Sequence, residues 1–206
     1  MLHIVIVDKN YAELCDPIKQ STPTKKKTPF SQKEIDLLWD NVHKVPFVDM
    51  ILIGIYSGWR PRELATLKTK DIDLKQKIMR GGSKTAAGKN RIVPIHPLIY
   101  SLIEKRLDPS KEYLFNDMTL PTEHTELDYD KYYKRFINTM SYLNLNHAPH
   151  ETRHTFVTKA KQVKMDENIL KKIIGHSITD ITESIYTHRD VSVLSNTPSK
   201  KTSPPV

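Results

Sequence analysis

Apolar residues recur at helical spacing through much of the chain, and this pattern is the main guide to its fold. In the range 166–174, four Ile and Leu side chains share one helical face, and Gly175 fits the position after the last turn. Further helices are predicted at about 97–106, 129–143, 149–163 and 179–187.

Start and stop signals mark three earlier helices. Ser31 and Glu34 form a capping box that predicts the start of the first one. The range 46–56 opens on a proline and is almost wholly apolar, so the second helix should be buried, with Gly58 as its stop. The range 61–67, which also opens on a proline, predicts a short third helix.

A small sheet is expected between the two groups of helices. The ranges 72–79 and 90–95 have the composition of strands and flank the pair Gly81-Gly82. No internal repeat is present. The sequence therefore predicts an α+β domain that is mainly α-helical, with one small antiparallel β-sheet.

Length and composition fit a single globular unit. The 206 residues can form one sizeable core, and 38% apolar with 27% charged residues is typical of globular domains. The longest apolar stretch, 45–56, contains Asp49 and is too short to span a bilayer. Residues 1–7 are apolar but make a poor signal peptide, because no basic region precedes them and Asp8 follows.

Cysteine usage and charge narrow the function. The single cysteine, Cys15, excludes an internal disulfide framework and a four-cysteine zinc site, and a reducing cytoplasm is the default compartment. The formal net charge of +8 favours polyanionic partners, of which nucleic acid is the most common.

Five short motifs carry candidate chemistry. They are Gly58-Trp59-Arg60-Pro61-Arg62-Glu63-Leu64, Ser83-Lys84-Thr85, His150-Glu151-Thr152-Arg153-His154, Gly175-His176-Ser177 and Ile185-Tyr186-Thr187-His188. Two arginines, a lysine and two histidines are what a protein needs to hold one phosphate and move its protons. A tyrosine ten residues after His176 supplies a nucleophile, provided that a base and nearby cations help it ionise.

The placement of each cation supports a phosphate site. Arg60 follows the end of a buried helix, in a loop held by rigid elements, with Arg62 as its rival. His150 and Arg153 are three residues apart, so they share one face in the first turns of a helix, where the dipole favours an anion. His176 can bond a phosphate oxygen or cap the preceding helix.

Two ambiguities remain among these motifs. Lys84, at the turn between the strands, can protonate a leaving oxygen, but Lys77 and Lys89 are nearby alternatives. The stretch 150–154 also matches His-Glu-x-x-His, the zinc metalloprotease signature. That match lies at a helix start, includes a cation at Arg153 and lacks a downstream third ligand, so no metal site is expected.

Together the motifs resemble those of tyrosine recombinases, the phage-integrase family of DNA strand-exchange enzymes. The family pattern is Thr/Ser-Gly-x-Arg-x-x-Glu-Leu, a hairpin lysine, His-x-x-Arg-His, then Gly-His and a tyrosine about ten residues later. The match runs from about Phe30 to His188. It implies that Tyr186 attacks a DNA phosphorus and forms a 3′-phosphotyrosyl link, and that Lys84 protonates the leaving 5′-hydroxyl.

The resemblance assigns roles to the other motif residues. Arg60, Arg153 and His176 stabilise the charged transition state, and Glu63 orients the loop. His150 either accepts the tyrosine proton or donates a second bond to the phosphate. Residues predicted to contact DNA are Lys25, Lys26, Lys27, Lys89 and Arg91.

The resemblance also predicts domain boundaries and partners. Residues 1–29 resemble the end of a preceding core-binding domain plus a basic linker, residues 30–190 form the catalytic domain, and residues 191–206 form a flexible tail. The chain is therefore expected to be a C-terminal fragment. Its expected partner is double-stranded DNA, with a tetramer on paired sites and a monomer when free. No cofactor, metal or membrane partner is expected, and the location is the cytoplasm of a bacterial or phage-infected cell.

Three other functions are compatible with parts of this pattern. A type IB topoisomerase uses similar chemistry without exchanging partners. A non-catalytic DNA-binding module would keep the basic surface and form no covalent adduct. A zinc protease would bind stoichiometric metal.

Overall fold

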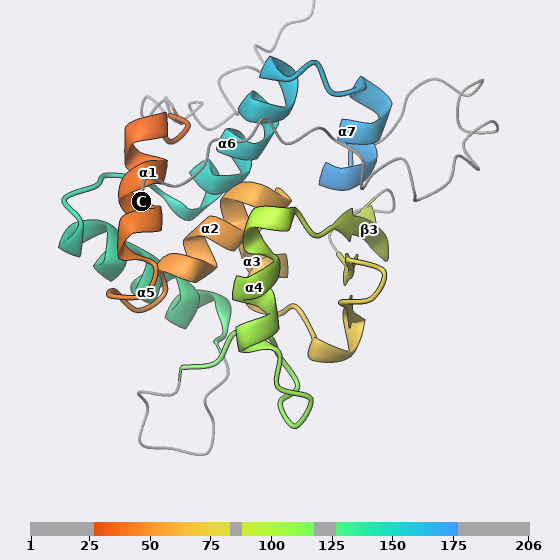
Figure 1. Ribbon diagram of the computed structural model, residues 1–206, viewed down its shortest axis with the longest axis horizontal. Coiled ribbons are helices and arrows are strands. Elements are labelled where there is room, and N and C mark those ends of the chain that lie inside the picture. The colour runs from red at the N-terminus through yellow and green to blue at the C-terminus, as the bar shows by residue number, and fades with distance from the viewer. Residues whose placement is uncertain (1–26, 83–87, 118–126, 177–206) are drawn as a thin grey trace, which may run out of the picture.

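The computed structural model describes residues 27–82, 88–117 and 127–176, and within these ranges it confirms a mainly helical fold with a small antiparallel sheet (Figure 1). The elements are α1 (Gln32–Asn41), α2 (Val48–Ser57), α3 (Pro61–Ala65), a 3-10 helix (Thr69–Asp71), β1 (Ile72–Asp73), β2 (Ile78–Gly81), β3 (Arg91–Pro94), α4 (Pro97–Arg106), α5 (Tyr129–Tyr142), α6 (Pro149–Gln162) and α7 (Glu167–Ile174). The expected helix 179–187 lies outside the described residues.

Helix α2 forms the centre of the core, as its apolar composition predicts. Eight of its ten residues are buried, and it packs against α1, α4 and α6. The helix begins at Val48 rather than at Pro46, because Phe47 has a left-handed backbone conformation with φ 66° and cannot continue a helix. In Figure 1 α2 lies between α6 above it and α4 in front.

Helix termini follow the predicted signals closely. Ser31 and Glu34 form the capping box that starts α1, with the Glu34 side chain accepting from the Ser31 N–H at 2.7 Å. Gly58 and Gly175 end α2 and α7 in left-handed conformations, with φ 67° and 66°. A Cβ atom on Gly58 would lie 2.5 Å from Cδ1 of Phe156, so both space and backbone favour glycine there.

The sheet has three strands in the order β1-β2-β3, and both pairs are antiparallel. The prediction of one strand over 72–79 is wrong, because the chain turns between Asp73 and Ile78. Asp73 Oδ1 accepts from the Gln76 N–H at 2.8 Å, and Lys77 has φ 55°. An Asp side chain that bonds the backbone within a turn competes with the strand in this way. Strand β3 packs against α7, at the right of Figure 1.

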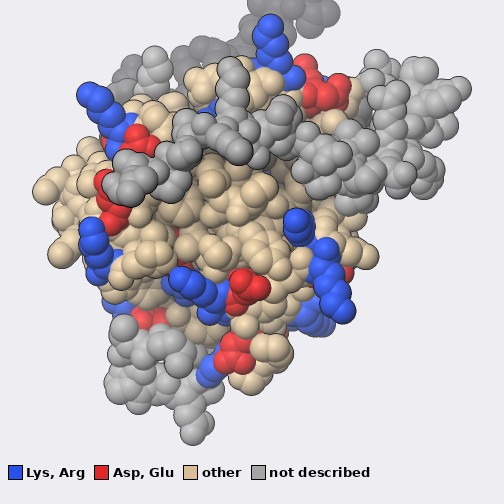
Figure 2. Space-filling view, in the orientation of Figure 1, with Lys and Arg blue, Asp and Glu red and all other residues tan. Residues whose placement is uncertain are grey.

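The surface of the described part of the chain carries both signs of charge. On the face shown in Figure 2, Lys and Arg lie close to Asp and Glu around a broad area without charged side chains. This face is therefore not uniformly basic, although the whole chain has a formal net charge of +8. Within the described ranges, none of the helices has the length and apolar character needed to cross a membrane.

Candidate active site

Arg153 is fixed inside the protein near the first turns of α6. The residue is 9% exposed, and its Nη1 donates to the Gly58 carbonyl at 2.8 Å. Its Nη2 donates to the Ile174 carbonyl at 2.5 Å. These carbonyls lie at the ends of α2 and α7, so one guanidinium joins three helices. A cation held this firmly needs little reorganisation when an anion arrives.

Arg60 lies beside this position, immediately before α3. Its Nη1 donates to Glu63 Oε1 at 3.1 Å, and its Nη2 donates to the Gly175 carbonyl at 3.2 Å. The other oxygen of Glu63 accepts from Arg91 Nη2 at 2.7 Å. Glu63 therefore orients the Arg60 loop, as expected, and also connects it to β3.

The site carries more positive charge than its carboxylate can balance. Three guanidinium groups, those of Arg60, Arg91 and Arg153, act on the single carboxylate of Glu63. Burial would raise the pKa of Glu63, but Arg91 and Arg60 bring it below its ordinary value. Burial, followed by the charges of Arg60 and Arg91, lowers the pKa of Arg153 to about 10, with Glu63 opposing the shift. An anion placed among these groups would relieve their mutual repulsion.

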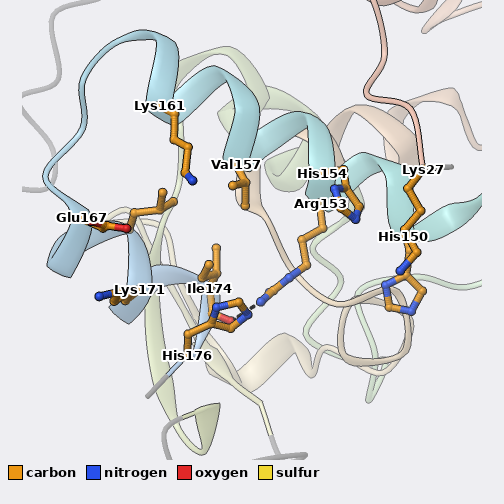
Figure 3. Close-up of a pocket in the computed structure, with 11 residues that line it drawn as sticks. Lys27, His150, Arg153, His154, Val157, Lys161, Glu167, Lys171, Ile174 and His176 are labelled. Atoms are coloured by element: carbon orange, nitrogen blue, oxygen red, sulfur yellow. Dashed lines mark hydrogen bonds between the residues drawn. The ribbon is translucent and has the colours of Figure 1, made fainter. Parts of the chain in front are cut away.

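His150 and His176 border the same region. Both are exposed, and they line one cavity of about 360 Å³ together with Arg153. Figure 3 shows the Arg153 side chain extending from α6 toward His176 and the Ile174 carbonyl. Although His176 is exposed, partial desolvation, followed by the charges of Arg153 and Arg60, lowers its pKa. A neutral imidazole can still donate one hydrogen bond to a phosphate oxygen.

Arg62, the rival of Arg60, points elsewhere. Its guanidinium carbon lies 5.2 Å from the ring centroid of Tyr129, and the residue is exposed. Arg60, by contrast, is half-buried and bonded to the end of α7. The structure therefore separates two arginines that the sequence places only two positions apart.

Arg91 does not occupy the surface position that a DNA contact needs. Its side chain is 3% exposed, its Nε donates to the Ile173 carbonyl at 2.9 Å, and its Nη1 donates to the Gly88 carbonyl at 3.3 Å. Its guanidinium also lies 4.1 Å from the ring centroid of Trp59. All three of its nitrogens bond within the protein, so we assign Arg91 a positioning role and do not retain it as a DNA contact.

The remaining predicted residues are only partly described. Lys27 lines the same cavity as Arg153, and Lys89 is exposed beside β3. The predictions for Lys84 and Tyr186, together with those for Lys25 and Lys26, fall outside the described residues. Their roles stay predictions.

The zinc-protease alternative does not fit the position of Glu151. This side chain turns into the protein, where Oε2 lies 2.7 Å from His147 Nδ1 and Oε1 accepts from the Thr28 N–H at 3.1 Å. It is therefore not placed as a general base between His150 and His154. Within the described ranges, no group of three or more His, Cys, Asp or Glu side chains could hold a metal ion.

His147 is a site-supporting residue that the sequence motifs did not reveal. It is 7% exposed, and its ring stacks on Phe30 at a centroid distance of 3.7 Å. Its partners are Glu151 and Glu34, the second 113 positions away in the chain. The available signal was weak: His147 lies three residues before His150, outside the matched motif.

Comparison with known proteins identifies relatives over most of the chain. The model of the phage integrase family matches residues 29–192. Tyrosine recombinase XerA from Pyrococcus horikoshii is 30% identical over 194 residues, which cover 88% of this chain and 62% of that protein. Tyrosine recombinase XerH from Helicobacter pylori is 26% identical over 187 residues, covering 84% and 51%. The chain therefore spans about three fifths or less of the length of these relatives.

Solved structures share the fold. A crystal structure of XerA recombinase matches with a TM-score of 0.62 and 22% identity, covering 86% of this chain and 64% of that one. The Tn1549 transposon integrase, solved in complex with circular intermediate DNA, matches with a TM-score of 0.61 and 23% identity, covering 91% and 68%. At these identities the structural likeness establishes the fold alone.

Proposed function

Because the chain belongs to the phage integrase family, we propose that it is the catalytic domain of a tyrosine recombinase, which cleaves and rejoins DNA at specific sites. The observation that carries the proposal is the excess of positive charge around Glu63. Arg60 and Arg91 pair with the Glu63 carboxylate, and Arg153 adds a third guanidinium within its electrostatic range. His150 and His176 border the cavity that Arg153 lines. This arrangement suits a phosphodiester that gains negative charge as it reacts.

The proposed reaction exchanges one phosphodiester for another. Tyr186 Oη attacks the phosphorus, the bond to the 5′-oxygen breaks, and a 3′-phosphotyrosyl link forms. The tyrosine proton passes to an acceptor, for which His150 is the candidate, and Lys84 supplies the proton that the leaving 5′-hydroxyl needs. The free 5′-hydroxyl of a partner strand then attacks the phosphotyrosine and regenerates Tyr186. No ATP is required, because the phosphodiester energy is conserved in the intermediate.

The described cations have distinct roles in this scheme. Arg60 and Arg153 stabilise the non-bridging oxygens, since a guanidinium offers paired donors and stays charged. His176 donates a further bond to the same phosphate. We propose that Glu63 and Arg91 hold these groups in place and do not touch DNA, whereas Lys25, Lys26, Lys27 and Lys89 contact the backbone.

The proposed partner is double-stranded DNA. The Tn1549 integrase was solved in complex with circular intermediate DNA, and XerH was solved bound to difH substrate. We also propose, as the motif resemblance to tyrosine recombinases implies, that four subunits assemble on paired DNA sites and that the free chain is monomeric, in the cytoplasm.

Covalent capture tests the proposed activity. A nicked duplex loses a short fragment after cleavage, so rejoining is blocked and the protein–DNA adduct accumulates. The recognition site is first identified by selecting, from a library of random-sequence duplexes, those that the chain captures covalently. The wild-type chain should give an adduct that survives denaturant without added metal. A DNA-binding module would give none, and a topoisomerase would relax DNA without exchanging strands between paired sites.

A further inference from the structure

The junction between the linker and the catalytic domain is attached to α6 by contacts that we call the linker clasp. It consists of Thr28, Phe30, His147, Glu151 and Thr155. The Thr28 N–H donates to Glu151 Oε1 at 3.1 Å, and the Phe30 N–H donates to Thr155 Oγ1 at 2.8 Å. These partners are 123 and 125 positions apart in the chain, and the 4% exposed Phe30 stacks on His147. The linker end is thus fixed to the helix that carries Arg153.

The acceptors of the clasp are themselves held in place. Glu151 Oε2 accepts from the Ala148 N–H at 3.0 Å and lies 2.7 Å from His147 Nδ1, while His147 Nε2 lies 3.2 Å from Glu34 Oε1. Burial would raise the pKa of Glu151, but the Thr28 and Ala148 N–H groups and His147 bring it below its ordinary value. The carboxylate therefore stays ionised at neutral pH and keeps its grip on the Thr28 backbone.

This attachment determines where Lys27 can reach. Lys27 is bonded directly to Thr28, and its side chain lines the cavity with His150, Arg153 and His176. Lys27 and His150 both line this cavity, and Figure 3 labels them at the same end of the view. Within the described ranges, Lys27 takes part in no ion pair, and one acidic residue lines the cavity, against several cations.

We propose that Lys27 is a phosphate-binding residue of the active site and that the linker clasp holds it there. Its ammonium group contacts the phosphate next to the one that is cleaved, whose own oxygens are taken by Arg60, Arg153 and His176. The inference rests on the proposed function and deepens it. A lysine on a free tether loses much conformational freedom when it binds, whereas a clasped lysine has already lost part of it. Lys27 therefore binds phosphate at a lower cost in conformational entropy than a lysine on a free tether would.

The test compares Lys27→Gln with Lys33→Gln. Both replace an exposed lysine by a neutral residue, but Lys33 lies on α1 and does not line the cavity. Binding to the selected duplex is measured at several salt concentrations. Loss of one phosphate contact should reduce the slope of log K against log salt by about 0.9 for Lys27→Gln. Lys33→Gln should leave the slope unchanged, and Lys27→Arg should retain it.

Replacing single DNA phosphates by neutral groups locates the phosphate that Lys27 contacts. Each phosphate flanking the cleaved one is replaced in turn by a methylphosphonate, which has no charge. On one of these two duplexes the wild type and Lys27→Gln should bind equally, because the contact is already lost. The inference is overturned if Lys27→Gln weakens binding to both duplexes as strongly as to unmodified DNA, or if it behaves like Lys33→Gln.

The role of the clasp is tested through Thr155→Val, which removes the oxygen that accepts from Phe30. In this background the effect of Lys27→Gln should shrink, because the linker end is no longer fixed over the cavity. A full effect would show that the clasp is not needed. Failure of the proposed function looks different: the wild type would then form no covalent adduct. If the wild type forms the adduct normally but Lys27→Gln has no effect on DNA binding, only the present inference is overturned.

Discussion

Glu63→Gln should destabilise the free protein strongly, although it keeps the size of the side chain. Glu63 oxygens lie 2.7 Å from Arg91 Nη2 and 3.1 Å from Arg60 Nη1, and the three side chains are 6%, 3% and 15% exposed. Removing one partner of a buried ion pair costs about 3–5 kcal/mol, since the other charge remains buried. Gln can still accept from one guanidinium, so we expect a loss near the lower end, about 3 kcal/mol. Small domains have about 5–15 kcal/mol in total, so the variant should still fold at 25 °C.

Urea denaturation at pH 7, followed by circular dichroism, measures this loss of unfolding free energy. The matched control is Glu112→Gln, whose carboxylate pairs with Lys68 at 2.8 Å on the surface, with side chains 56% and 40% exposed. Solvent screens that pair, so the control should change the unfolding free energy far less. Equal effects of the two substitutions, or a loss below about 1 kcal/mol for Glu63→Gln, would contradict a stabilising role for the pairing of Glu63 with Arg91 and Arg60.

The difference in unfolding free energy between the wild type and Glu63→Gln should depend on pH. The pKa of Glu63 in the folded protein lies below its ordinary value of 4.5. Its stabilising contribution is therefore complete above pH 4.5 and is lost as the pH falls through the lower, folded-state pKa. The difference between wild type and Glu63→Gln should be largest near neutral pH and shrink on acidification. A difference that grows on acidification would contradict the assignment.

Two further predictions concern the cations. Arg60→Ala and Arg153→Ala should each lower the rate of DNA cleavage in single-turnover assays about a hundredfold or more, because each loses a donor to the transition state. Arg62→Ala should have a much smaller effect, because the Arg62 side chain lies over Tyr129. The reverse ranking of Arg60 and Arg62 would refute the assignment. Arg60→Gln should raise the pKa of His176, because the Arg60 charge lowers it, and an NMR titration of the imidazole that shows no rise would contradict this electrostatic link.

Local signals predicted the helices well. The range 97–106 coincides with α4, and the capping box of Ser31 and Glu34 starts α1. Two elements departed from the prediction because of single backbone conformations. The left-handed Phe47 delays α2, and the turn that Asp73 and Lys77 form divides the first predicted strand. Both conformations occur at non-glycine residues, for which sequence gives little indication.

The site shows where sequence motifs stop being informative. The motifs named Arg60, Arg153, His150 and His176, and the fold brings these residues together around the ends of α2, α6 and α7. The burial of Arg91 depends on Glu63, which is 28 positions away, and such long-range pairing is not encoded locally. Strand alternation was the available signal, because residues 91 and 93 share the buried face of β3.

Tyr186 is the proposed nucleophile, and locating the covalent link in the protein is the decisive experiment. After capture on a nicked duplex, the adduct is digested with protease and nuclease, and mass spectrometry identifies the peptide that carries the nucleotide. We expect the 3′-phosphate to be joined to Tyr186, and we expect Tyr186→Phe, which loses only the hydroxyl, to form no adduct. A nucleotide attached to any of the other tyrosines, or an undiminished adduct with Tyr186→Phe, would contradict it.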